Sequence, residues 1–178
     1  MGIRFVEKVS QNAQKSDAKS NATVNTAFFG SYKYNVDSKK RVCFPPDYVK
    51  ILDTMYKDEN RTLIVGLCLN GTVGVYPVKN YKAFLDQFKK EPVLDQNMMD
   101  LLNVVQGCTT VQTLDSQKRF RLSDELCGYA GITKEVYLKG FDDHVEVWDK
   151  ERWENYAKTT IPRLRDIANQ AHKSSKKE

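Results

Sequence analysis

Two short segments of the chain repeat the same acidic, hydroxyl and basic side chains at the same spacing. Both lie between apolar residues that alternate along the chain, as in strands, so each segment is expected to form a turn. An aspartate at the start of a tight turn accepts hydrogen bonds from backbone N–H groups two or three residues further on, and a serine adds a second acceptor. The residues predicted to fix the two turns are Asp37 and Ser38 in the first segment and Asp115 and Ser116 in the second.

The basic side chains of the same segments are candidates for nucleic-acid contact. Lys39, Lys40 and Arg41 supply three positive charges beside one carboxylate, which leaves a surplus without a local partner. An arginine can form a forked pair with O6 and N7 of guanine in the major groove, while a lysine can neutralise a phosphate. A β-ribbon or a loop beside a strand can enter that groove as a helix can. The residues predicted to contact double-stranded DNA are Lys39, Lys40, Arg41, Lys118 and Arg119.

A purely structural role for the same charges is the alternative. Aspartate and arginine four residues apart can pair across a turn only to hold it, and such a pair is worth at most about 1 kcal/mol when exposed. We favour this role for Asp37 and Asp115, and we favour DNA contact for the basic residues. The second segment is the less basic of the two, because Gln117 stands where the first has Lys39.

The overall composition is that of a globular protein with a mild positive charge. Of 178 residues 40% are hydrophobic, and 28 lysines and arginines against 23 aspartates and glutamates give a net charge of +5. A surplus of this size favours an anionic partner without identifying one. The sequence has no apolar stretch of about 18 residues and no signal-peptide core at its start. We therefore expect no membrane association and a cytoplasmic location, and the predicted contact with DNA would make it nucleoid-associated.

The sequence offers little to a metal ion or to a catalytic mechanism. Four cysteines lie far apart with no CxxC pair, and only two histidines accompany them. Their apolar neighbours indicate reduced, buried thiols rather than disulfides. No Ser-His-Asp arrangement and no glycine-rich phosphate loop is visible, so we expect no metal site, no cofactor and no enzymatic activity. The cysteines and histidines are Cys43, Cys68, Cys108, Cys127, His144 and His172.

The elements around the first turn can be predicted from local patterns. Alternating apolar residues predict strands at 32–36 and 42–44, and Pro45-Pro46-Asp47 opens a short helix. Asn70-Gly71 separates two β-branched runs, which predicts a hairpin with a type I′ turn, since that turn needs positive φ at both central residues. Helices are then expected at 79–90 and 94–105.

The same order of elements begins again after these helices. Strands are expected at 110–114 and 120–122, followed by a short helix that Ser123 caps and Gly131 ends.

The second series closes with a hairpin and a helix. Residues 136–138 and 145–148 are expected to pair as the hairpin. The helix is expected to be capped by Asp149 and to bury Trp153 and Tyr156.

The two halves share one plan, which indicates a tandem duplication. Asp37 and Asp115 lie 78 residues apart, as do Arg41 and Arg119, and Tyr76 and Trp148 lie 72 residues apart.

The predicted class is α+β with a mainly β core. The predicted divisions are a flexible leader at 1–27, a first repeat with its trailing helix at 28–91, a connecting helix at 92–106, a second repeat at 107–157, and a basic helical tail at 158–178.

Three stretches of the sequence resemble the MraZ family. They are G-S-Y-K-Y-N-V-D-S-K-K-R-V-C-F-P from Gly30 to Pro45, N-G-T-V-G-V-Y-P from Asn70 to Pro77, and V-E-V-W-D-K-E-R-W from Val145 to Trp153. The resemblance implies two AbrB-like swapped-hairpin halves that form a pseudo-twofold β-barrel with flanking helices. It also implies ring-like homo-oligomers that bind short repeated promoter boxes and repress the division and cell wall genes.

The resemblance also assigns roles to positions in the two turns. Lys39 and Arg41 in the first half, and Arg119 in the second, are the DNA-facing positions that it implies. Family members usually have glycine before the motif arginine, where this chain has Lys40 and Lys118. The turn must therefore either accept a lysine with positive φ or have a different shape. The alternative function is an antitoxin-like module of the AbrB type that binds DNA and a protein partner.

Overall fold

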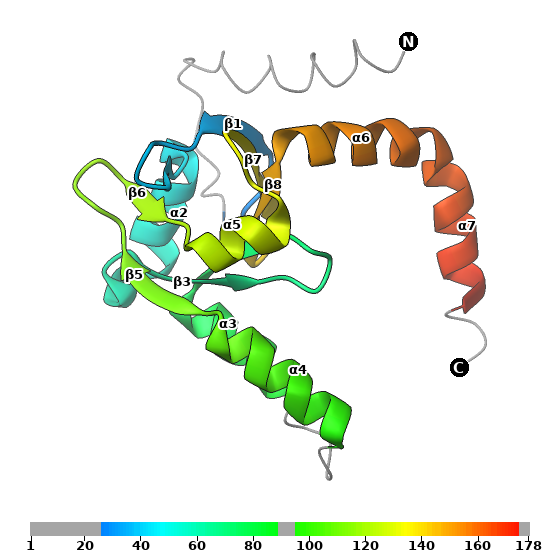
Figure 1. Ribbon diagram of the computed structural model, residues 1–178, viewed down its shortest axis with the longest axis horizontal. Coiled ribbons are helices and arrows are strands. Elements are labelled where there is room, and N and C mark those ends of the chain that lie inside the picture. Colours follow the sequence, from blue (N-terminus) through cyan, green and yellow to red (C-terminus); the bar gives the residue numbers. More distant parts are fainter. Residues whose placement is uncertain (1–25, 89–94, 175–178) are drawn as a thin grey trace.

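The computed structural model describes residues 26–88 and 95–174, and the following elements are numbered as in Figure 1. Almost all of the predicted leader lies outside these residues. The strands are β1 (Ser31–Asn35), β2 (Arg41–Cys43), β3 (Thr62–Leu67), β4 (Val73–Pro77), β5 (Thr110–Thr113), β6 (Arg119–Arg121), β7 (Glu135–Phe141) and β8 (His144–Asp149). The helices are α2 (Pro46–Met55), α3 (Val78–Phe88), α4 (Gln96–Gly107), α5 (Asp124–Ala130), α6 (Lys150–Thr160) and α7 (Leu164–Ser174), with 3-10 turns at η1 (Lys57–Glu59) and η2 (Ile161–Arg163).

The strands of the two halves are interleaved in one antiparallel sheet. Its order is β1-β7-β8-β4-β3-β5, so the first strand of each half pairs with the hairpin of the other half. A separate ladder joins β2 to β6. Val42 lies opposite Phe120, and Gly74 lies opposite Glu146. Equivalent residues of the two halves thus face each other, as an approximate twofold axis between them requires.

The expected closed barrel is not found. Closure requires the outermost strands to hydrogen-bond to each other, and among the described residues β1 and β5 have no ladder between them. Instead β2 and β6 leave the sheet after their turns and, within residues 26–88 and 95–174, form a ladder only with each other. The architecture is therefore a mixed α/β fold with an open, antiparallel sheet.

One main hydrophobic core is shared by both halves. Alternate residues of the central strands point into it, because successive side chains of a strand face opposite sides of the sheet. The opposite side of β3 and β4 packs against α3 through a second cluster made of Ile64, Cys68, Tyr76 and Tyr81. Residues of the main core include Val42, Phe44, Leu63, Val65, Phe120, Leu122, Val136 and Leu138.

The predicted hairpin between β3 and β4 forms, but its predicted turn type is wrong. Gly71 has a φ of 80°, whereas Asn70 does not have a positive φ. The amide of Gly71 donates to the carbonyl of Cys68 at 3.0 Å, and the amide of Cys68 donates to the carbonyl of Thr72 at 2.9 Å. This is a three-residue loop, which needs only one residue in the left-handed region. The side chain of Asn70 instead accepts hydrogen bonds from the amide and hydroxyl of Thr72.

The predicted helix caps of the second half are confirmed. The hydroxyl of Ser123 accepts a hydrogen bond from the amide of Leu126 at 3.2 Å, and Gly131 ends α5 with a φ of 65°. The carboxylate of Asp149 accepts from the first amides of α6. Hydrogen bonds of this kind satisfy donors that the first turn of a helix leaves free.

The predicted burial of α6 is only partly correct. Trp153 packs edge to face on Trp148, but Tyr156 is 48% exposed. The reason is visible in Figure 1, where α6 runs away from the sheet and α7 turns down from its far end. The described part of the chain contains no helix whose length and apolar character would allow it to span a bilayer.

Candidate nucleic-acid interface

The first turn is built around the carboxylate of Asp37. Its Oδ1 accepts hydrogen bonds from the amides of Lys39 at 2.8 Å and Arg41 at 2.9 Å. Its Oδ2 accepts from Nε of Arg41 at 2.8 Å and lies 2.7 Å from Nη2 of the same guanidinium. One carboxylate therefore holds both the backbone of the turn and the side chain that closes it.

The second turn repeats this arrangement around Asp115. Its Oδ1 accepts from the amides of Gln117 and Arg119, each at 2.9 Å. Its Oδ2 accepts from Nε of Arg119 at 2.9 Å and lies 2.8 Å from Nη2. The serines do not serve as the second acceptors expected from the sequence, because both are exposed and their hydroxyls have no hydrogen bond to any described residue. They are Ser38 and Ser116.

These contacts change the acidity of both aspartates. The hydrogen bond from the Arg41 side chain lowers the pKa of Asp37 from 3.8 to about 2, aided by the backbone amides of the turn. The corresponding bond from Arg119 lowers the pKa of Asp115. Both carboxylates are therefore ionised at neutral pH and compensate part of the positive charge around them.

The lysine that precedes each arginine adopts a left-handed conformation, so the first of the two alternatives for the turn holds. Lys40 has a φ of 58° and Lys118 a φ of 60°. This conformation turns each lysine carbonyl toward the other half, where Lys40 O accepts from Leu122 N and Lys118 O accepts from Phe44 N, both at 2.8 Å. The two turns thus fasten the two halves to each other.

The turns also lie side by side. Nη1 of Arg119 is 3.9 Å from Oδ2 of Asp37, so this guanidinium lies between the carboxylates of both turns. The ladder between β2 and β6, which begins directly after the turns, fixes this proximity. Residues 78 positions apart in the sequence therefore form one continuous feature.

Two of the three basic side chains of the first turn form ion pairs. This corrects the expectation that their positive charge has no local partner. Arg41 is paired with Asp37, and Nζ of Lys40 is paired with the carboxylate of Asp124 at the start of α5. Lys39 is exposed. An arginine has five N–H donors, and Asp37 engages only Nε and Nη2 of Arg41. The carboxylate consequently orients this guanidinium and leaves donors for another acceptor.

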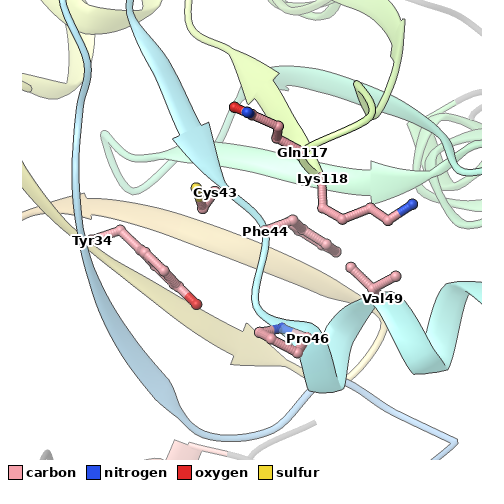
Figure 2. Close-up of a pocket in the computed structure, with 7 residues that line it drawn as sticks. All are labelled: Tyr34, Cys43, Phe44, Pro46, Val49, Gln117 and Lys118. Atoms are coloured by element: carbon pink, nitrogen blue, oxygen red, sulfur yellow. The ribbon is translucent and has the colours of Figure 1, made fainter.

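A shallow pocket of about 390 Å³ lies beside the second turn (Figure 2). In Figure 2 the side chain of Lys118 extends along the pocket toward Val49 of α2, and Tyr34 and Pro46 stand on the other side. The methylene stem of a lysine can pack on an apolar surface while its ammonium stays in water. The pocket is lined by Tyr34, Cys43, Phe44, Pro46, Val49, Gln117 and Lys118.

The ladder between β2 and β6 adds a basic residue that the sequence analysis missed. Val42 and Phe120 are 0% and 2% exposed and point into the core, so their neighbours lie on the outer face. Arg121 is one of these neighbours, is exposed, and lies opposite Arg41. The alternation Arg119-Phe120-Arg121 is the signal that could have identified it. We call this outer surface the twin-turn face, defined by Lys39, Arg41, Cys43, Arg119 and Arg121.

The side chain of Gln112 holds the strand that carries Arg121. Its Oε1 accepts from the amide of Arg121, and its Nε2 donates to the carbonyl of the same residue, each at 2.8 Å. Cys43 occupies the position equivalent to Arg121 in the first half and is exposed, which corrects the expectation that all four thiols are buried. All four cysteines are free.

Comparison with known proteins identifies the family. Residues 106–173 match the family model described as "MraZ protein, putative antitoxin-like". A protein of Finegoldia magna is 30% identical over 141 residues, which cover 79% of this chain and 94% of the relative. A protein of Clostridium acetobutylicum is 28% identical over 134 residues, covering 75% and 89%.

A third relative, from Nitratidesulfovibrio vulgaris strain Miyazaki F, is 32% identical over 127 residues, covering 71% of this chain and 83% of the relative. All three relatives are named transcriptional regulator MraZ. The matches span most of this chain and between 83% and 94% of each relative. With this identity and coverage, the chain belongs to the MraZ family of transcriptional regulators.

Proposed function

We propose that this protein is a transcriptional regulator that binds promoter DNA through the twin-turn face. The observation that carries the proposal is the meeting of two similar basic turns through the β2–β6 ladder, with Arg41, Arg119 and Arg121 on its outer surface. A short two-stranded ribbon is a shape that the major groove can admit. The names of the relatives support a role in transcription.

The residues of the face have different parts in this proposal. Arg41 and Arg119, held by their aspartates, present oriented guanidinium groups suited to guanine edges. Lys39 and Arg121, both exposed, neutralise phosphates or reach bases beside them. The ammonium groups of Lys40 and Lys118 lie toward the neighbouring helices rather than toward the DNA. These two lysines therefore contribute to the positive potential of the face without contacting DNA directly. The paired aspartates shape the turns that carry these groups, and Ser38 and Ser116 lie exposed beside them.

The interleaved pairing of the strands supports a swapped-hairpin architecture of the AbrB type. We place the first repeat at 28–91, the connecting helix at 92–106 and the second repeat at 107–157, with a leader at 1–27 and a basic tail at 158–178. In such a pair of repeats, neither half completes its sheet alone, as the pairing of β1 with β7 and β5 with β3 illustrates. The resulting unit carries two turns related by an approximate twofold axis.

Self-association into a ring-like oligomer completes the proposed mechanism. Apolar side chains exposed along α6, η2 and α7 support an interface between subunits, since contiguous apolar surface favours association. Several turns aligned with repeated promoter boxes gain overall affinity by about 10² to 10⁴ without new contacts. Occlusion of RNA polymerase would then repress transcription in the nucleoid. The exposed residues are Tyr156, Ile161, Leu164 and Ile167.

Selection of bound DNA from a random pool tests the proposal. The full chain should enrich a short sequence, and binding of that sequence should weaken when Arg121 is changed to glutamine. Lys82→Gln, an exposed position on α3, removes one positive charge away from the twin-turn face and serves as the control. Failure to enrich any sequence, or equal weakening by both variants, would contradict binding through this face.

A further inference from the structure

Three potential metal ligands from distant parts of the chain meet beneath α3. Cys68 follows β3, while His144 and Glu146 belong to β8. Their ligand atoms, the thiol sulphur, an imidazole nitrogen and a carboxylate oxygen, all lie within 4.8 Å of one another. Cys68 is 6% exposed and Glu146 is 8% exposed. Local sequence patterns do not predict this cluster, because its members come from hairpins of different halves.

We propose that Cys68, His144 and Glu146 form a binding site for one divalent transition-metal ion of the zinc class. Thiolate, imidazole and carboxylate are ligands that zinc takes in proteins, whereas magnesium and calcium prefer oxygen ligands alone. Coordination of the sulphur releases the thiol proton to solvent. The ion would join the β3–β4 hairpin of the first half to β8 of the second and so stabilise the interleaved fold.

The surroundings of His144 are those of a metal-binding imidazole. Its Nδ1 lies 2.6 Å from Oδ1 of Asp143, and its ring stacks on Tyr76 with ring centres 4.4 Å apart. Histidines that bind metals usually donate one ring N–H to a carboxylate, which fixes the ring and presents the other nitrogen to the ion. The contact with Asp143 therefore leaves Nε2 as the metal ligand.

Glu146 is a buried carboxylate held by neutral donors. Asn70 Nδ2 donates to Oε1 and Trp148 Nε1 donates to Oε2, both at 2.7 Å. Lys139 lies opposite Glu146 in the ladder, but its ammonium is over the ring of Trp153 at 3.4 Å. No ion pair of Glu146 occurs within the described ranges. The charge of Lys139 still acts on Glu146 through space, but no cation of the described residues is in direct contact with the carboxylate. Since a buried charge is costly without a close opposite charge, a bound cation would add compensation that Lys139 supplies only in part.

The packing around Cys68 brings its sulphur into the cluster. A Cβ on Gly74, which lies opposite Glu146, would be 2.7 Å from Sγ of Cys68. The absence of a side chain at Gly74 therefore leaves space for the sulphur and for the ring of Tyr76, which would be still closer to such a Cβ. The hydroxyl of Tyr76 contacts the same sulphur at 3.4 Å. The neighbours that position the sulphur thus both belong to β4.

The separations suit a zinc ion after a small contraction. Bonds of roughly 2.0 to 2.3 Å in a tetrahedral site place ligand atoms roughly 3.5 Å apart. The present separations, at most 4.8 Å, need to shorten by no more than about 1.3 Å each to reach that value. The side chain of His144 is partly accessible, which provides the entry route and leaves the fourth position to a water molecule.

Cobalt(II) is the probe for this site, because a bond between cobalt and a thiolate produces a charge-transfer absorption in the near ultraviolet. The full chain should bind one Co²⁺ per subunit with this absorption, and Zn²⁺ should displace it. Cys68→Ser should abolish the absorption, while Cys43→Ser, which removes the exposed thiol on the twin-turn face, should leave it intact. An absorption that is absent from the wild type, or that is lost in the Cys43 variant and kept in the Cys68 variant, would overturn the proposal.

A thermal measurement tests the site without depending on the buried cysteine. An ion that binds only the folded state raises Tm with its concentration. Zn²⁺ should raise the Tm of the wild type and should have at least tenfold less apparent affinity for His144→Ala, whose ring is partly exposed and is the easier ligand to remove. His172→Ala, in α7, is the matched control and should respond like the wild type. Equal Zn²⁺ responses of the two histidine variants would refute the assignment.

Discussion

The carbonyl of Lys40 accepts a hydrogen bond from the amide of Leu122 at 2.8 Å, although the two residues belong to different halves of the chain. The equivalent bond joins Lys118 to Phe44 at the same distance. Both lysines that accept these bonds have a positive φ. The conformation of the turn and the association of the two halves are therefore one structural property.

Replacing Lys118 by glycine should stabilise the fold. The left-handed conformation costs an L-residue about 1 to 2 kcal/mol that glycine does not pay, although the greater freedom of glycine in the unfolded chain offsets part of it. We expect a net gain of about 1 kcal/mol in the free energy of unfolding, measured by urea denaturation. Lys82→Gly, in the interior of α3, should instead lose about 1 kcal/mol. A loss for both variants would contradict a strained turn.

Acid should weaken the fold through the two turn aspartates. The folded state lowers the pKa of Asp37 from 3.8 to about 2, so the stabilisation is present above pH 3.8 and is lost as the pH falls toward 2. Asp37→Asn should be less stable than the wild type at pH 7, and the difference should disappear near pH 2. Denaturant unfolding at a series of pH values measures this. A difference that is independent of pH would show that the charge of Asp37 is irrelevant.

Exchange of Lys39 and Gln117 tests the proposed DNA contacts of the two turns. Lys39→Gln should weaken binding to the selected sequence, and Gln117→Lys should strengthen it, since each changes one exposed positive charge at equivalent positions. If the lysine contacts a phosphate, the slope of log K against log salt should change by about 0.9 in opposite directions. If the salt dependence of both variants equals that of the wild type, these two side chains do not contact the DNA.

Removing the N-terminal cap of α5 should lower the free energy of unfolding. Ser123→Ala loses the hydrogen bond to the amide of Leu126, and such a loss typically costs about 1 kcal/mol. Ser116→Ala is the matched control, because this serine is exposed and its hydroxyl has no partner in the described part of the chain; the change should cost less than about 0.5 kcal/mol. Thermal and urea denaturation of the two variants would reveal the difference, and equal costs would argue against the cap.

Features set by neighbours in sequence could be predicted. Ser123, Gly131 and Asp149 were identified from the sequence because a helix end is decided by the few residues around it. The hairpin loop shows the limit of such rules. Asn70 and Gly71 indicate a turn, but the turn type depends on Asn70 bonding Thr72 and the distant Glu146.

Features set by contacts between the halves could not be predicted from local patterns. The charges of Lys39, Lys40 and Arg41 look alike in the sequence, yet Lys40 finds its partner Asp124 only because α5 lies across the approximate axis. The exposure of Arg121 depends on the register of the β2–β6 ladder, which local patterns do not contain. Packing between segments far apart in the chain decides which of several similar side chains is free.

The covalent link between the two turns gives the twin-turn face a direction. In a dimer of identical hairpins, rotation by half a turn would exchange the two ends, and neither could differ from the other. Here Lys39 and Arg121 have Gln117 and Cys43 as their counterparts, so the two ends carry different charges. A linear polymer lying across this surface meets two unlike ends, and the two orientations of that polymer differ in energy.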